Sequence, residues 1–75
     1  MPKELEVVVL TRDLPEHRLE AGDVGTVVHV HSAGEAYEVE FVRAEGSTVA
    51  VLTLSAADVR LMTGQEILHA RKLAS

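Results

Sequence analysis

The stretch VGTVVHVHSAGEAYEVEFV, residues 24–42, decides the fold. In its second half, Tyr37–Phe41, apolar and acidic residues alternate strictly, which predicts a strand with one buried face. Its first half, Val24–His31, is rich in β-branched residues and predicts another strand, with Gly25 marking a bulge or a close backbone approach. Residues 32–35 read as a turn. We therefore expect an antiparallel hairpin whose second strand buries its apolar side.

Three further segments have the composition of strands: Leu5–Leu10, Thr48–Leu54 and Val59–Leu61. A long polar segment, Thr11–Ala21, separates the first strand from the hairpin, and Ser55–Asp58 has the spacing of a cap, which predicts a 3₁₀ turn. A strand, a long loop, a three-stranded meander, a 3₁₀ turn and a short last strand form the SH3-like arrangement. The expected fold is all-β, a small SH3-like five-stranded barrel.

The chain has 75 residues, which predicts a single domain spanning 1–75. Residues 63–75 are expected to form a short C-terminal extension of the barrel. Within the extension, Glu66–Leu73 fits neither the period of a helix nor that of a strand, and we favour an edge strand.

Composition excludes several classes of function. Cysteine is absent, so disulfides, thiolate metal sites and thiol catalysis are excluded, and a reducing cytoplasm is favoured. No apolar run approaches the length of about 20 residues that spans a membrane. The net charge of −5 argues against nucleic-acid binding, which needs a basic face. No nucleophile motif or phosphate-binding loop is present, so we expect no enzymatic activity and no cofactor.

His29 and His31 are the most conspicuous candidates for a metal site. Residues two apart share one face of a strand, and neutral imidazole binds zinc or copper. A zinc site needs at least three protein ligands, however, and no spacing in the sequence supplies the others. Since Val24, Thr26, Val28 and Val30 form the more apolar face, we expect that face to lie in the core and the histidines to point outward, without a metal.

Apolar residues make up 47% of the chain, more than so small an interior readily hides. Residues 7–10 and 49–52 are apolar on both strand faces, which indicates a surface covered by another protein or by a second copy. The long loop mixes both charge signs around Pro15 and offers a second contact. The residues expected to bind a partner are Val8, Leu10, Val27, His29 and His31 on the sheet, and Arg12, Asp13, Glu16 and Arg18 in the loop.

Three motifs resemble a family of small bacterial proteins known as a domain of unknown function: Asp13–Glu16, Gly22–Val28 and Tyr37–Phe41. The resemblance covers nearly the whole chain. Gly22–Val28 also looks like the first hairpin of other SH3-like barrels, among them the photosystem reaction-centre subunit and KOW domains. Genes of the family often lie beside a second small gene, an arrangement that suits an antidote or partner protein.

The preferred interpretation is a cytoplasmic, non-enzymatic interaction module that binds a protein partner or itself, and an antidote or accessory subunit is one concrete form of it. Homo-oligomerisation is expected, and membrane association is not. Two alternatives stay open at this point: KOW-like binding to RNA or a ribonucleoprotein, and metal binding through His29 and His31.

Overall fold

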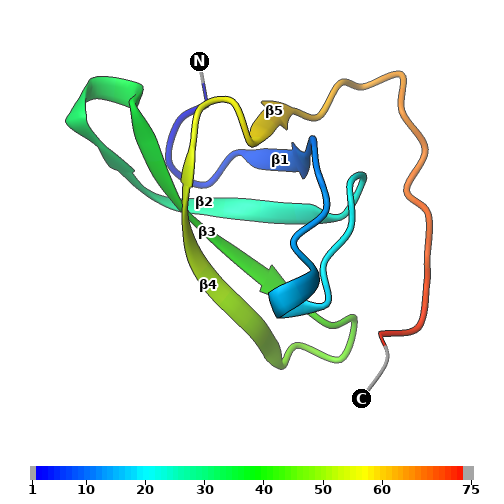
Figure 1. Ribbon diagram of the computed structural model, residues 1–75. Helices are drawn as coiled ribbons and strands as arrows, with labels where there is room; N and C mark the ends of the chain where they lie inside the picture. The colour runs from blue at the N-terminus through cyan, green and yellow to red at the C-terminus, as the bar shows by residue number, and fades with distance from the viewer. Residues whose placement is uncertain (1, 74–75) are drawn as a thin grey trace.

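A computed structural model describes residues 2–73, which form one antiparallel five-stranded sheet (Figure 1). The strand order is β4-β3-β2-β1-β5, so β1 to β4 are neighbours in sequence order and β5 returns beside β1. This order confirms the all-β prediction. The elements are β1 (Val7–Leu10), η1 (Pro15–His17), β2 (Val24–His31), η2 (Ser32–Gly34), β3 (Ala36–Val42), β4 (Thr48–Ser55) and β5 (Val59–Leu61).

The sheet curls but does not close into a ring. Each strand pairs with its neighbours in the order above, and β4 and β5 form the two edges without pairing to each other in the described chain. A long loop follows β1, and β2, β3 and β4 form a meander. The barrel expected from the sequence is therefore an open one.

The core lies on one side of the curled sheet. Tyr37, Val39 and Phe41 face it from β3, as their alternation predicted, and each is at most 2% exposed. Val8, Leu10, Val27, Leu54 and Val59 complete it from the other strands. The core thus draws on all five strands, which is how so short a chain encloses an interior.

A β-bulge in β2 corrects the expected orientation of that strand. Thr26 and Val27 pair with Glu40 and Val39, but His29 pairs with Glu38, so β2 contains one extra residue at Val28. Gly25 and Val27 therefore face the core, whereas Val24 and Val28 are 37% and 40% exposed. After the bulge the side chains change faces, and Val30 packs against the core. The prediction that Val24, Thr26 and Val28 line the core is wrong, although the histidines do point outward.

The long loop folds back on itself and covers one end of the core. Leu14 and Leu19 exchange backbone hydrogen bonds of 2.8 and 3.1 Å and are 2% and 4% exposed. Between them, η1 begins at Pro15, and Arg18 closes the turn in a left-handed conformation. Burial of the two leucines makes the loop an ordered part of the fold.

The connection between β4 and β5 is a single turn. The Asp58 amide donates to the Ser55 carbonyl at 3.0 Å, which is the hydrogen bond of a 3₁₀ turn. In return, the Asp58 carboxylate accepts from the Ser55 amide and hydroxyl at 3.1 Å each. The carboxylate half of the capping arrangement that the Ser-x-x-acid spacing predicted is therefore present.

Both faces of β1 are largely buried within the chain. Val8 and Leu10 lie in the core, and Val9, on the opposite face beside Val24 and Arg60, is only 4% exposed. Val7 is 39% exposed. The apolar second face of β1 therefore does not present the broad partner surface that the sequence indicated.

Residues 62–73 form the C-terminal tail, which is neither strand nor helix. It leaves β5 and passes along the side of the sheet towards the β3–β4 hairpin (Figure 1, orange to red). The expected edge strand at Glu66–Leu73 is wrong because side-chain contacts of Glu66 and Arg71, rather than a strand ladder, direct this part of the chain. No helix within residues 2–73 has the length and apolar character needed to cross a membrane.

Candidate functional site

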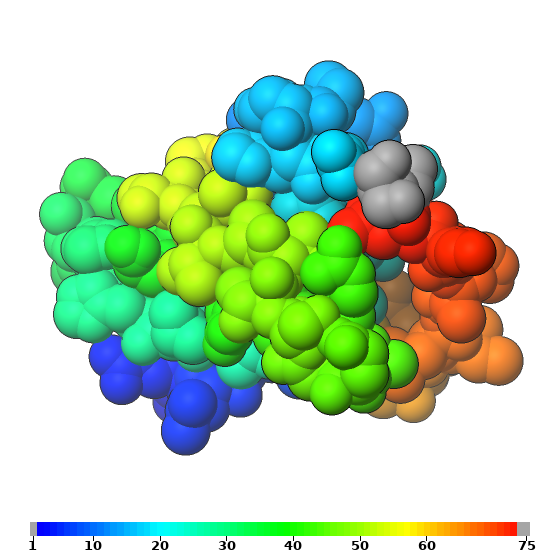
Figure 2. Space-filling model, turned by 90° about the horizontal axis from the view of Figure 1, so that it is seen from below, coloured from blue at the N-terminus to red at the C-terminus, as the bar shows by residue number. Residues whose placement is uncertain are grey.

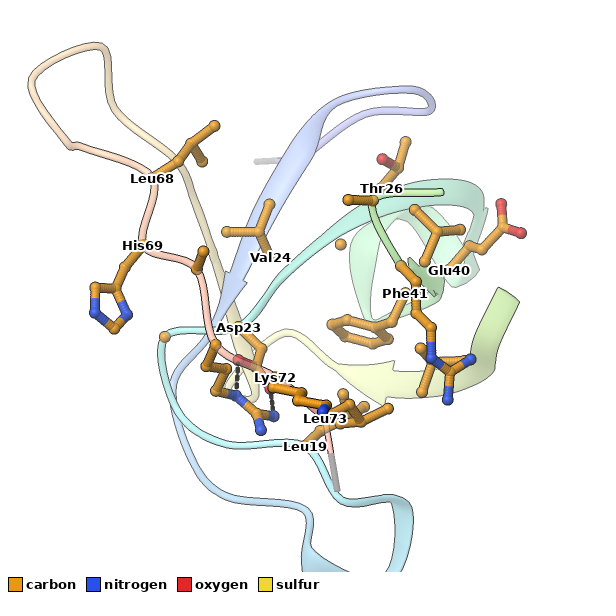
Figure 3. Close-up of a pocket in the computed structure, with 18 residues that line it drawn as sticks. Leu19, Asp23, Val24, Thr26, Glu40, Phe41, Leu68, His69, Lys72 and Leu73 are labelled. Carbon is orange, nitrogen blue, oxygen red and sulfur yellow. Dashed lines mark hydrogen bonds and ion pairs between the residues drawn. The ribbon is translucent and has the colours of Figure 1, made fainter. Parts of the chain in front are cut away.

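A groove of about 710 Å³ lies between the C-terminal tail and the end of the sheet where β2 begins and β3 ends (Figure 3). Val24, Phe41 and Val42 form its floor, and the tail forms the opposite wall with Leu68 and Leu73. Figure 2 shows the tail (orange and red) beside the β3–β4 hairpin. The walls are mainly apolar, and charged groups lie at the ends.

The groove opens here because β2 and β3 diverge. Their pairing begins only at Thr26 and Glu40, whereas Val24 pairs with Val9 of β1. Val24 and Val42 consequently stay 37% and 53% exposed. The divergence leaves apolar side chains facing a space that the protein itself does not fill.

Arg71 fastens the tail across the groove. Its Nε donates to Asp23 Oδ1 at 2.9 Å, and its Nη2 donates to the Arg18 carbonyl at 2.9 Å and also to Asp23 Oδ2. Glu20 Oε2 lies 3.6 Å from Nη1. One guanidinium thus joins the tail to the loop and to the start of β2, with 28% of its side chain exposed.

The acidic partner of Arg71 is held in its charged form. Partial burial raises the pKa of Asp23, but hydrogen bonds from Arg71 and from the Glu20 amide, together with the charge of Arg71, outweigh burial. The pKa of Asp23 therefore lies below its usual value, and the pKa of Arg71 lies above its own. The pair remains ionised through the neutral range.

A second ion pair holds the start of the tail. Arg60 of β5 donates to both carboxylate oxygens of Glu66, at 2.9 and 2.6 Å, and the Thr63 amide donates to the same carboxylate at 2.8 Å. The hydrogen bond from Arg60, followed by that from Thr63, lowers the pKa of Glu66 to about 2. The tail is therefore fixed by two arginine–carboxylate pairs, one before the segment that lines the groove and one within it.

In the loop, Arg12 and Asp13 are engaged in holding the fold. Arg12 Nε donates to Asp58 Oδ1 at 2.7 Å, and this contact is the main reason that the pKa of Asp58 is lowered. Asp13 Oδ1 accepts from the Ala21 amide at 2.9 Å. Glu16 and Arg18 are exposed near the tip, and the Arg18 carbonyl receives Arg71. The expected loop contacts thus divide into two structural residues and two surface residues.

On the sheet, three of the expected partner-binding residues lie in the core. Val8 and Val27 are 0% exposed and Leu10 is 2% exposed, because the β2 bulge and the pairing of β1 turn them inward. Their assignment to a partner surface is therefore wrong. His29 is exposed and His31 is half-buried, and both point outward as expected.

The two histidines contact each other and one acidic residue each. Their rings lie 4.6 Å apart at 74° in an edge-on arrangement. His29 Nδ1 is 3.6 Å from Glu4, and His31 Nε2 is 3.9 Å from Glu38. Among residues 2–73 no group of three or more metal-ligating side chains converges, here or elsewhere. The pair reads as an exposed polar face.

Sequence reasoning did not identify the groove, because three distant segments build it. The sequence places Asp23 in the motif Gly22–Val28 and Arg71 in the segment Glu66–Leu73, and nothing in either segment links the two. The available signal was the composition of the tail. Its apolar residues, Ile67, Leu68 and Leu73, follow neither a helical nor a strand repeat, and they lie on either side of the basic pair Arg71–Lys72. An aperiodic apolar and basic segment beside an acidic domain suggests docking onto that domain.

Comparison with known proteins gives a family and no characterised relative. Neither the curated proteins nor the solved structures contain a significant match to the chain. Residues 4–61, from the turn before β1 to the end of β5, match a family model, and the tail lies outside that match. The chain therefore belongs to the family described as Domain of unknown function (DUF4926).

Proposed function

We propose that this protein is a non-enzymatic interaction module whose groove binds an extended segment of a partner protein. The observation that carries the proposal is the tail, which binds along this edge of the sheet and forms one wall of the groove. The tail runs beside the sheet as extended chain, with Leu68, 69% exposed, and Leu73 lining the groove and Arg71 bound to Asp23. The expected partner segment has the same chemistry: apolar side chains and an arginine.

The electrostatics support a basic partner. Asp23, Glu20 and the Arg18 carbonyl together form a guanidinium site, in which Asp23 provides the paired oxygens that arginine prefers. The net charge of −5 also attracts a basic protein over a longer range. Conversely, Arg12, Arg60 and Arg71 are each paired with a carboxylate, which reduces the positive charge available to RNA.

In this proposal the tail acts as a built-in competitor. A partner segment would displace Arg71 from Asp23 and occupy the space beside Phe41 and Val42. An antidote that covers a basic site on a neighbouring protein is one concrete form of this activity. We place that encounter in the cytoplasm, where a chain without cysteine is at no disadvantage.

The test uses the tail sequence as the probe. A labelled peptide of residues 63–73 is titrated into the full-length wild type and into full-length Arg71→Ala, and binding is followed by NMR shifts of Asp23 and Val24. The wild-type tail competes at an effective concentration on the order of 1 mM. We therefore expect the peptide to bind Arg71→Ala at least about 10-fold more tightly than the wild type.

Two controls make the result specific. The same peptide with alanine in place of its arginine should bind Arg71→Ala weakly, and Arg71→Ala combined with Asp23→Asn should lose the preference for the arginine peptide. Thermal unfolding of each variant checks that it is folded. Equal binding of the two peptides, or no binding to Arg71→Ala, would refute the proposed groove chemistry.

A further inference from the structure

The two edges of the sheet differ sharply in how they are protected. At one edge, β5 has three residues, includes Arg60 and leads directly into the tail that Glu66 fastens to it. At the other, β4 has eight residues, Thr48–Ser55, none of which is charged or proline. Proteins usually shield long edge strands with charges, prolines, bulges or a covering segment. The central part of β4 has none of these.

The backbone of β4 offers unpaired hydrogen-bonding groups at Val51 and Thr53. The amide and carbonyl of Ser55 both bond to Asp58 and so point away from β3. Backbone groups alternate along an antiparallel strand, so those of Val51 and Thr53 point the same way. Since β4 pairs only with β3, these two amides and two carbonyls have no partner within residues 2–73.

The ends of β4 limit where another strand could pair. The register shift opposite Phe41 and Val42 places an extra residue near Val49, which disrupts one end of the strand. At the other end, Ser55 is already capped by Asp58. The free edge is therefore the short segment centred on Leu52. It lies open on the face shown in Figure 2 (yellow-green).

We propose that β4 pairs antiparallel with β4 of a second copy, about a two-fold axis at Leu52. In that register Val51 of each copy lies opposite Thr53 of the other, and the free groups form four hydrogen bonds. Leu52, which is only partly buried against the core, meets its symmetry mate. The two curled sheets would then form a single ten-stranded sheet. This proposal does not depend on the groove.

A second copy suits this edge better than a charged partner does. The segment is uncharged and its one pairing register is self-complementary, with Val51, 52% exposed, set beside a threonine. No like charges meet across the pair within β4. Glu38, which accepts a hydrogen bond from Thr53 at 3.4 Å, lies on the next strand, and each copy carries a net charge of −5. Association should therefore strengthen as salt screens this repulsion.

The test is sedimentation equilibrium of the full chain from about 10 µM to about 1 mM at low and high salt. We expect a concentration-dependent dimer that tightens with salt, and slower amide exchange at Val51 and Thr53 as concentration rises. Thr53→Pro removes an outward-pointing amide, which an edge strand tolerates, and should weaken the dimer at least about 10-fold. Thr53→Val keeps that amide and is the matched control.

Val51→Lys adds a charge at the edge and provides a second variant in case Thr53→Pro does not fold. It too should weaken the dimer at least about 10-fold, while thermal unfolding shows that the monomer is intact. A wild type that stays monomeric at about 1 mM overturns the proposal. So does a dimer that a folded Thr53→Pro or Val51→Lys variant leaves unchanged.

Discussion

Replacing Gly25 with alanine should test the close packing of β2 against β3. A Cβ atom at this position would lie 2.6 Å from Val39 Cγ1, 2.9 Å from Phe41 Cε1 and 3.0 Å from the Glu40 carbonyl oxygen. Carbon atoms in contact normally lie about 3.5–4.0 Å apart, so Val39 or the backbone would have to move by roughly 1 Å. Val39 is fully buried, so its side chain cannot turn out into solvent.

The expected cost follows from overpacking a tightly packed contact between two strands. Inserting a methyl group into such a site lowers the free energy of unfolding by about 1–3 kcal/mol. For a domain of this size, a loss of about 2 kcal/mol corresponds to a Tm lower by roughly 8–16 °C. Circular dichroism melts and urea unfolding of Gly25→Ala would measure both quantities.

Gly64 provides the matched control. A Cβ atom built there meets nothing within 4 Å. Gly64→Ala should leave stability unchanged or raise it by up to about 1 kcal/mol, because alanine restricts the unfolded chain. A free energy of unfolding for Gly25→Ala within about 0.5 kcal/mol of the wild-type value is typical of a surface substitution. That result would show that Gly25 does not lie against Val39, and the packing argument would fail.

A double variant locates the clash. Val39→Ala removes the methyl group nearest to the new Cβ, at the cost of a cavity. Combined with Gly25→Ala, it should cost at least about 1 kcal/mol less than the sum of the two single changes. If the losses in the free energy of unfolding are additive, the strain caused by Gly25→Ala lies elsewhere in β2 and not at Val39.

Three other predictions concern the tail, a buried hydroxyl and a turn. The folded-state pKa values of Asp23 and Glu66 lie below their usual values, so the stability that their arginine pairs contribute is present above about pH 4.3. That contribution is lost as the pH falls towards the folded-state pKa, which is about 2 for Glu66. NMR relaxation should then show residues 66–73 becoming mobile. A tail that is as rigid at pH 2 as at pH 7 would contradict this prediction. The buried Tyr37 hydroxyl has no hydrogen-bond partner among the described residues, so Tyr37→Phe should raise the free energy of unfolding by about 1 kcal/mol, and a loss of stability would reveal a missing contact. Ala33 has φ 56° and ψ 34°, a left-handed conformation that costs roughly 1–2 kcal/mol, so Ala33→Gly should raise the Tm, and a lower Tm would argue against that backbone conformation.

The sequence predicted those parts of the fold where local pattern and packing agree. In Tyr37–Phe41, strict alternation identified both the strand and its buried face, and the Ser-x-x-acid spacing identified the turn at Ser55–Asp58 and the contact between these two residues. The orientation of β2 was not predictable in the same way. Apolar residues occupy both faces there, and the bulge at Val28 exists only relative to the pairing of β2 with β3.

The candidate site depended on information that no single segment contains. The sequence contains more apolar residues than a small interior was expected to bury, which placed Val8, Leu10 and Val27 on a partner surface. The structure buries all three within the chain. The groove joins the start of β2, the end of β3 and the tail. Its key contact, between Arg71 and Asp23, spans 48 residues and follows from tertiary structure alone.

The bulge at Val28 also has a consequence for how the chain could change in length. On either side of it, Val27 and Val30 face inward while His29 and His31 face outward. Deleting Val28 would therefore restore a regular two-residue repeat and leave each of these side chains on its present face. What the deletion would remove is the bend, because a bulge increases local twist. Val28 thus marks the point where β2 passes from pairing with both β1 and β3 to pairing with β3 alone.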